Sequence, residues 1–253
     1  MQFCKKLVLI FITTALLCTH LAAKENDYIQ GLSDKDSEIP IKFHQNAEFV
    51  LGSNTMQGYE PSPVSTSFYY NIFGNRFSAA AGTKLEKGDT QLTISGSYKF
   101  FKHPKVSLGT GIVYNLDWLH DFSLSNNFLP SLFIIFTPND FYSLKFDADF
   151  FFKVRNVFAL SDDLSSLVNA TMAFSLRNEF TLPKDILLYF EFASIERFRY
   201  MILCAPSFIF GGRYSAFENF DLTLEAAIRY IDFFTLSAHY DDTEIRIGAS
   251  YKW

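Results

Sequence analysis

Apolar and polar side chains alternate along much of this chain with a period of two. From Thr243 to Trp253, the odd-numbered residues after Thr243 are apolar, and the even-numbered residues are polar or small. Successive side chains of a β-strand point to opposite faces, so this segment is predicted to be a strand with one apolar and one polar face. The same alternation recurs at 106–117, 142–155 and 221–231. A slip of one residue would exchange the two faces, so the pattern also specifies the register of these strands.

The whole chain divides into segments of strand length. We expect an all-β, up-and-down antiparallel β-barrel of about twelve strands, with ten as the lower bound. No stretch after the N-terminal region has enough consecutive apolar residues for a transmembrane helix. The predicted strands are 42–53, 64–74, 76–86, 90–102, 105–118, 128–137, 141–156, 167–181, 186–200, 204–214, 219–235 and 243–253.

Short and long connectors tend to alternate between these strands, as they do at the two ends of such a barrel. The longer polar connectors, at 54–63, 119–127, 157–166 and 236–242, are assigned to the outer side, together with a short one at 87–89. The tight connectors carry residues typical of turns and are assigned to the periplasmic side. They are Gly74-Asn75, His103-Pro104, Pro138-Asn139-Asp140, Pro183-Lys184-Asp185 and Ala216-Phe217-Glu218.

The N-terminus has the pattern of a secretory signal peptide. Lys5 and Lys6 precede an apolar run, and small residues end at Ala23, so residues 1–23 are predicted to be cleaved. An acidic, polar leader over 24–41 then precedes the barrel, at 42–253. Cleavage removes two lysines and no acids, so the formal charge changes from −5 to −7, which argues against nucleic acid as a partner. Cys204 then remains as the single cysteine, so no internal disulfide is expected.

The final strand resembles that of bacterial outer-membrane β-barrel proteins, because it alternates and ends on an aromatic residue. The resemblance covers 243–253 and implies that Tyr251 and Trp253 form the signal read by the barrel-insertion machinery. It also implies that the apolar face contacts outer-membrane lipid, and aromatic pairs near strand ends, such as Phe100-Phe101, fit an interfacial girdle. Alternation alone also allows a soluble secreted β-protein that buries its apolar face.

The polar face then lines the lumen with charges of both signs in nearly equal number. Such charges either pair and fill the lumen or leave a narrow, weakly selective passage for small solutes. The expected functions are therefore a passive channel or a structural surface protein, and the pattern does not specify an oligomeric state. The predicted lumen-lining residues are Lys84, Lys99, Asp117, Lys145, Asp147, Asp149, Lys153, Arg155, Arg177, Glu191, Arg213, Glu225, Arg229 and Arg246.

An outer-membrane enzyme is the alternative. His120 and His239 stand beside acids in predicted outer connectors, and Asp147 and Asp149 form an acid pair, which resembles the Asp and Asp-His pairs of omptin-type proteases. The chain has no Gly-x-Ser-x-Gly nucleophile motif and no His-x-x-x-His zinc pattern. We therefore predict no catalytic residue, cofactor or metal. Gly211-Gly212 is interpreted as relieving crowding within a strand or bending the sheet, rather than as a ligand site.

Overall fold

Most of the chain forms one antiparallel barrel. The computed structural model describes residues 43–56, 64–86, 89–118, 124–156, 167–203, 205–230 and 240–253, so the predicted signal peptide and the whole predicted leader lie outside them. Within the described residues no helix is long and apolar enough to cross a membrane. The strands are β1 (His44–Met56), β2 (Val64–Phe73), β3 (Phe77–Glu86), β4 (Asp89–His103), β5 (Val106–Trp118), β6 (Leu124–Asn139), β7 (Tyr142–Asn156), β8 (Leu167–Leu182), β9 (Ile186–Ala193), β10 (Glu196–Phe198), β11 (Met201–Leu203), β12 (Ser207–Phe217), β13 (Phe220–Tyr230) and β14 (Tyr240–Lys252).

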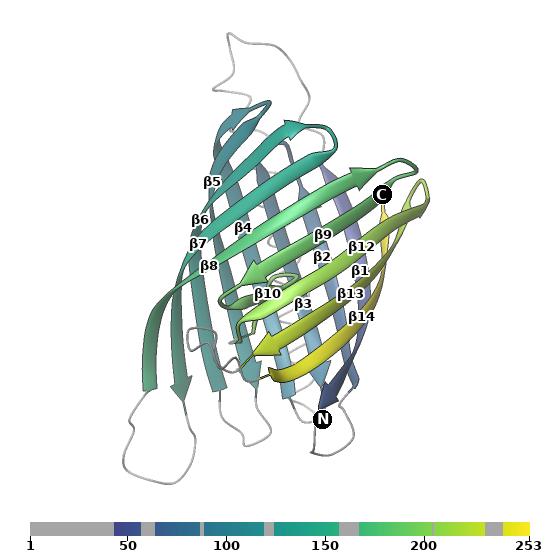
Figure 1. Ribbon diagram of the computed structural model, residues 1–253. Helices are drawn as coiled ribbons and strands as arrows, with labels where there is room; N and C mark the ends of the chain where they lie inside the picture. The colour runs from purple at the N-terminus through teal and green to yellow at the C-terminus, as the bar shows by residue number, and fades with distance from the viewer. Residues whose placement is uncertain are drawn as a thin grey trace, which may run out of the picture. The chain divides into compact units, whose positions relative to one another are not determined.

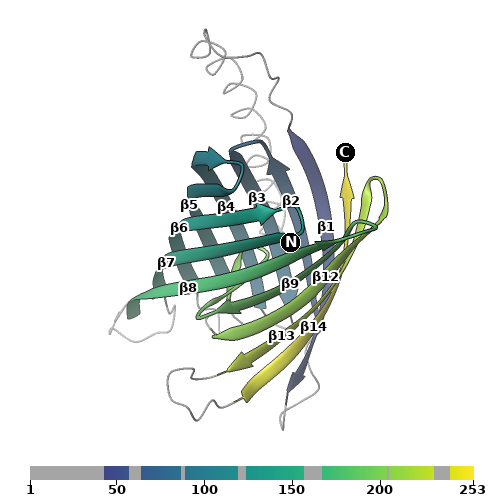
Figure 2. The ribbon, with the colours of Figure 1, turned by 45° about the horizontal axis from the view of Figure 1, so that its top comes forward.

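Twelve of these strands close the barrel, and β10 and β11 form a separate two-stranded sheet (Figure 1). β1 to β9 pair in chain order, β12 follows β9, and β14 returns to pair antiparallel with β1 (Figure 2). A closed ring of this kind leaves no unpaired sheet edge at the seam, as a barrel in lipid requires. The predicted up-and-down barrel of about twelve strands is confirmed.

The five tight connectors are confirmed at one end of the barrel. They join β2 to β3, β4 to β5, β6 to β7, β8 to β9 and β12 to β13. Asn139 Oδ1 accepts hydrogen bonds from the backbone N–H groups of Phe141 and Tyr142 and so stabilises one of these turns. Of the predicted outer connectors, 54–56, 124–127 and 240–242 belong to strands β1, β6 and β14.

The apolar face points away from the barrel axis. On β14, Ile245 and Ile247 are 47% and 60% exposed, whereas Glu244 and Arg246 between them are almost fully buried. Other strands show the same arrangement. Along them, most of the large exposed hydrophobic side chains alternate with buried polar ones. This orientation suits contact with lipid and is opposite to the apolar interior that the soluble alternative requires.

Aromatic rings inside the barrel lie against glycines of the neighbouring strand. The Tyr189 ring occupies the place that a Cβ atom on Gly211 would take, and the Tyr69 ring does the same at Gly82. Any larger residue at these glycines would displace the ring. Gly211 therefore relieves crowding, one of the two roles expected of it, and both glycines leave room for a large ring of the neighbouring strand.

One predicted strand is wrong in its second half. The segment 186–200 was expected to form a single strand, but β9 ends at Ala193 and β12 begins only at Ser207. Ser175 on β8 pairs with Ala193, so β8 continues past the end of β9. Ser194 forms a last backbone hydrogen bond to Phe174, after which the chain leaves the wall and folds inward as the β10–β11 hairpin (Figure 2).

Candidate functional site

The β10–β11 hairpin is a short two-stranded unit inside the barrel. Phe198 pairs with Met201, and Arg199 and Tyr200 form the turn between them. Both turn residues have positive φ values, 55° and 133°. A two-residue turn with positive φ at both positions usually contains Asn or Gly, because a Cβ atom crowds the backbone there. The hairpin therefore adopts a strained turn that surrounding contacts must hold in place.

Apolar side chains of the hairpin contact two separate parts of the barrel wall. Phe198 and Met201 pack with Val50 of β1 and Tyr69 of β2. Ile202 packs with a second group on the β5, β6 and β7 wall, formed by Val113, Leu129 and Phe151. Burial of each such side chain contributes about 1.5–3 kcal/mol relative to leaving it in water. Because the two groups lie on different sections of the wall, the hairpin crosses the lumen between them.

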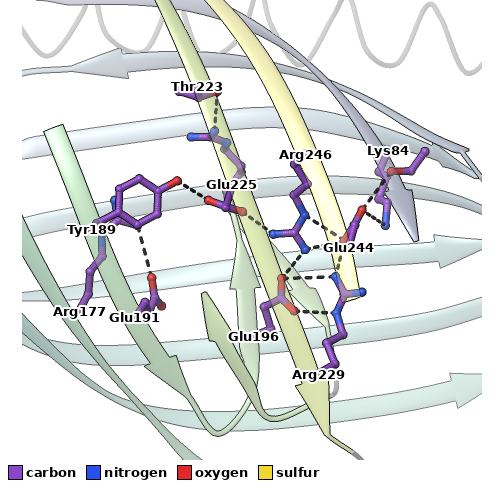
Figure 3. A network of polar contacts seen from close by, with 12 residues as sticks. Lys84, Arg177, Tyr189, Glu191, Glu196, Thr223, Glu225, Arg229, Glu244 and Arg246 are labelled. Atoms are coloured by element: carbon purple, nitrogen blue, oxygen red, sulfur yellow. Dashed lines mark hydrogen bonds and ion pairs between the residues drawn. The ribbon is translucent and has the colours of Figure 1, made fainter. Parts of the chain in front are cut away.

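Ion pairs join the first hairpin residue to β13 and β14 (Figure 3). Glu196 accepts from Arg229 at 2.7 Å and also pairs with Arg246. Arg246 donates to Glu225 at 2.5 Å and to Glu244 at 2.6 Å. Its guanidinium carbon lies 3.6 Å from the centre of the Phe198 ring, as in a cation–π contact. Two arginines and three carboxylates thus form a network that is almost closed to solvent.

The turn side of the hairpin is held by two further arginines. Arg197 pairs with Asp149 and with Asp147 at 3.3 Å on β7. Arg199 lies 3.1 Å from Glu48 on β1 and donates to the Thr223 hydroxyl on β13. Charge-assisted hydrogen bonds of this kind are stronger than neutral ones, and here their partners lie on three strands of the wall, β1, β7 and β13. The hairpin is therefore fixed at both ends by charge and along its length by apolar contacts.

Two cavities remain beside the hairpin. The larger has a volume of about 390 Å³ and is lined by residues that include Asn46, Arg177, Arg213 and the hairpin's Arg199. The smaller has a volume of about 210 Å³ and lies against β3 to β7. The lumen is thus neither uniformly filled nor uniformly open, because the hairpin separates hollow regions lined by polar groups.

The structure places most of the predicted lumen residues at buried or partly buried positions. Lys84, Asp117, Asp147, Asp149, Glu191, Glu225, Arg229 and Arg246 are buried, whereas Lys99, Lys145, Lys153 and Arg177 are partly buried. Arg213 is exposed, and the Arg155 side chain lies outside the described part of the chain. Several pairs form between strands, such as Arg177 with Glu191 at 3.3 Å. Pairing of lumen charges, one of the two alternatives, therefore occurs, although hollow regions also remain.

The charged residues of the hairpin were not predicted as lumen residues from the sequence. Arg197 and Arg199 alternate with aromatic residues, so they continue the alternation of a wall strand. Glu196 instead falls on the face of β9 that carries Phe190 and Phe192, and so it interrupts the apolar side of the pattern. Ser194 and Pro206 flank the segment and are the available signals that the chain leaves the wall there. Glu48 was also missed, and its role depends on Arg199, which is distant in sequence.

The residues considered for an enzyme do not come together as a catalytic group among the described residues. Asp147 and Asp149 both pair with Arg197, which gives them a structural partner. Asp242 pairs with Arg229 at 3.0 Å. His120, Asp121 and His239 lie outside the described residues.

The predicted insertion signal lies at the seam of the barrel. The Trp253 indole N–H donates to Gln45 Oε1 at 3.1 Å, and the Trp253 ring stacks on Tyr251 at 6.0 Å between centroids. Both side chains are more than half exposed on the outer face. Their role as a signal for the insertion machinery stays a prediction.

A closed barrel of twelve antiparallel strands, apolar outside and charged inside, has the fold of bacterial outer-membrane porins. The KdgM porin, solved in complex with disordered oligogalacturonate, is similar with a TM-score of 0.59 and 13% identity over 81% of this chain and 98% of that one. The NanC porin gives a TM-score of 0.57 and 10% identity over 82% and 100%. No family model matches the chain, and no curated protein sequence matches it. At these identities the likeness shows the fold alone.

Proposed function

We propose that this protein is a passive channel for small polar solutes in the bacterial outer membrane, and that the β10–β11 hairpin forms its constriction. The observation that carries the proposal is the hairpin itself, which crosses a charged lumen and leaves hollow regions beside it. Lipid covers the apolar outer face, and the barrel-insertion machinery is the expected partner in assembly.

The charges around the lumen support weak ion selectivity. Arg177, Arg199 and Arg213 line the larger cavity, but Glu48, Glu191 and other acids line it as well. A strongly selective pore more often carries rings of one sign. The KdgM structure contains an oligogalacturonate, an acidic ligand. In this chain the mixed lining favours small neutral and charged solutes over acidic oligomers alone.

Swelling of liposomes in sugar solutions tests this function. Liposomes that contain the refolded mature chain are expected to swell in a pentose, which the narrow lumen admits, and to swell far less in a trisaccharide. Liposomes with heat-denatured protein serve as the control for leakage. The absence of swelling in every sugar, with a barrel that runs as a folded, heat-modifiable band, would contradict a solute channel and favour a structural role.

A further inference from the structure

The smaller cavity has a floor of serine hydroxyls. The strand register places Ser78 opposite Ser97, Ser97 opposite Gly111, and Gly111 opposite Ser131, so these residues form one row across four strands. Gly111 leaves the row open, because a Cβ atom there would lie only 2.9 Å from Ser131 Oγ. Ser95 also lines the cavity. The Ser78 and Ser97 hydroxyls lie 2.7 Å apart and hydrogen-bond to each other, so one of them still has a donor for a ligand, as does Ser131.

The same cavity has an excess of positive charge. Lys99, Lys145 and Arg197 line it, whereas Asp147 is the one carboxylate among its described lining residues. Lys145 lies 3.0 Å from Asp147, and Arg197 pairs with Asp147 and with Asp149 behind it. Counting both aspartates against the three cations leaves a net charge of one positive unit among these five residues.

Lys99 accounts for this excess. Its charged neighbours are Lys102 and Lys145, and no carboxylate within the described part of the chain forms an ion pair with it. A partly buried ammonium group beside other lysines is unfavourable unless an anion or water compensates it. Lys99 follows Ser97 by two residues on β4 and lines the same cavity as the serine row.

We propose that this cavity, lined by Lys99, the serine row, Lys145 and Arg197, binds a small oxyanion of the phosphate or carboxylate class. The ammonium group of Lys99 supplies the charge, and the serine hydroxyls donate to the anionic oxygens. The volume of about 210 Å³ exceeds the roughly 10–15 Å³ that a single water needs, so a polyatomic anion fits with part of its hydration. The site depends on the geometry of the cavity and stands whether or not solutes cross the barrel.

Calorimetric titration of the folded, detergent-solubilised mature chain at low salt tests the site, with inorganic phosphate in one arm and acetate in the other. Lys99→Gln is expected to weaken binding by about tenfold or more, the loss typical of a charged hydrogen-bond partner. Lys102→Gln is the matched control, because Lys102 is exposed on the same strand, does not line the cavity and carries the same charge. It is expected to leave the affinity within about twofold of wild type, because solvent screens an exposed charge that does not line the cavity.

Ser131→Ala provides a second variant that leaves every charge in place. It removes one hydroxyl of the row and is expected to weaken binding by a few-fold, so it tests the site if Lys99→Gln fails to fold. Binding of phosphate, of acetate or of both supports the site and identifies which oxyanion it accepts. Equal affinity in wild type and Lys99→Gln, or no binding of either anion by a folded wild-type barrel, overturns it. Solute flux without anion binding would overturn this site while leaving the channel function intact.

Discussion

Replacing Glu196–Leu203 by a short glycine–serine linker is expected to let solutes through that the wild-type barrel excludes. The replacement removes Phe198, Met201 and Ile202, the apolar contacts that hold the hairpin across the lumen. It also removes Arg197 and its pairs with β7. A twelve-stranded ring is wide enough to hold a water-filled passage once no segment fills it. We therefore expect a trisaccharide to permeate several-fold faster than through wild type in the liposome assay.

The closure of the barrel should survive this change, because the hairpin forms a separate sheet and contributes no hydrogen bond to the ladder between wall strands. The heat-modifiable gel shift of the variant provides the control for folding. Lys102→Gln serves as a control for general effects of substitution, since Lys102 is exposed near a tight turn. A folded variant with the trisaccharide permeability of wild type would show that the hairpin is not the constriction.

Arg246→Ala is expected to cause the largest loss of stability of any single substitution in the lumen. Arg246 is 1% exposed and contacts three carboxylates, those of Glu196, Glu225 and Glu244. Without it, these acids remain buried close together with much less compensating charge. Removal of one partner from a buried ion-pair network costs about 3–5 kcal/mol. The free energy of unfolding should fall by about that amount. It is measured by titrating the barrel with urea and reading the folded fraction from the heat-modifiable gel band.

Arg213→Ala is the matched control for this loss. Arg213 is also an arginine of the inner wall, but it is exposed and lies 3.9 Å from its partner Asp221. Exposed pairs contribute about 0–1 kcal/mol, so this variant should unfold almost as wild type does. Adding Glu196→Gln to Arg246→Ala should recover part of the lost stability, because it removes one of the unpaired acids. Equal losses in the two arginine variants would contradict the role assigned to the network.

The alternation of side chains was sufficient to predict the barrel and its strand faces. Residues such as Glu244, Ile245 and Arg246 take opposite faces because the strand geometry requires it, and a glycine or proline marks several of the turns. Alternation did not specify which face lies inside. The resemblance of the terminal strand to outer-membrane barrels supplied that orientation, and the exposed apolar side chains confirm it.

The hairpin could not be predicted in the same way. The residues from Arg197 to Tyr200 alternate as a wall strand does, and the turn uses Arg199 and Tyr200 where the rules expect Asn or Gly. Its position depends on contacts between distant segments, such as Arg197 with Asp149 and Glu196 with Arg246. The alternation of apolar and polar residues along the chain does not indicate which distant residues form such pairs. The position of the hairpin is therefore a product of tertiary contacts.

Single-channel conductance in a planar bilayer, recorded for wild type and for the barrel without the hairpin, tests the central claim most directly. A narrow channel with a hairpin constriction predicts small discrete steps for wild type, with weak ion selectivity, and steps several-fold larger for the variant. Two well-folded barrels that show identical steps, or no steps at all, would contradict the claim that this protein is a channel narrowed by its β10–β11 hairpin.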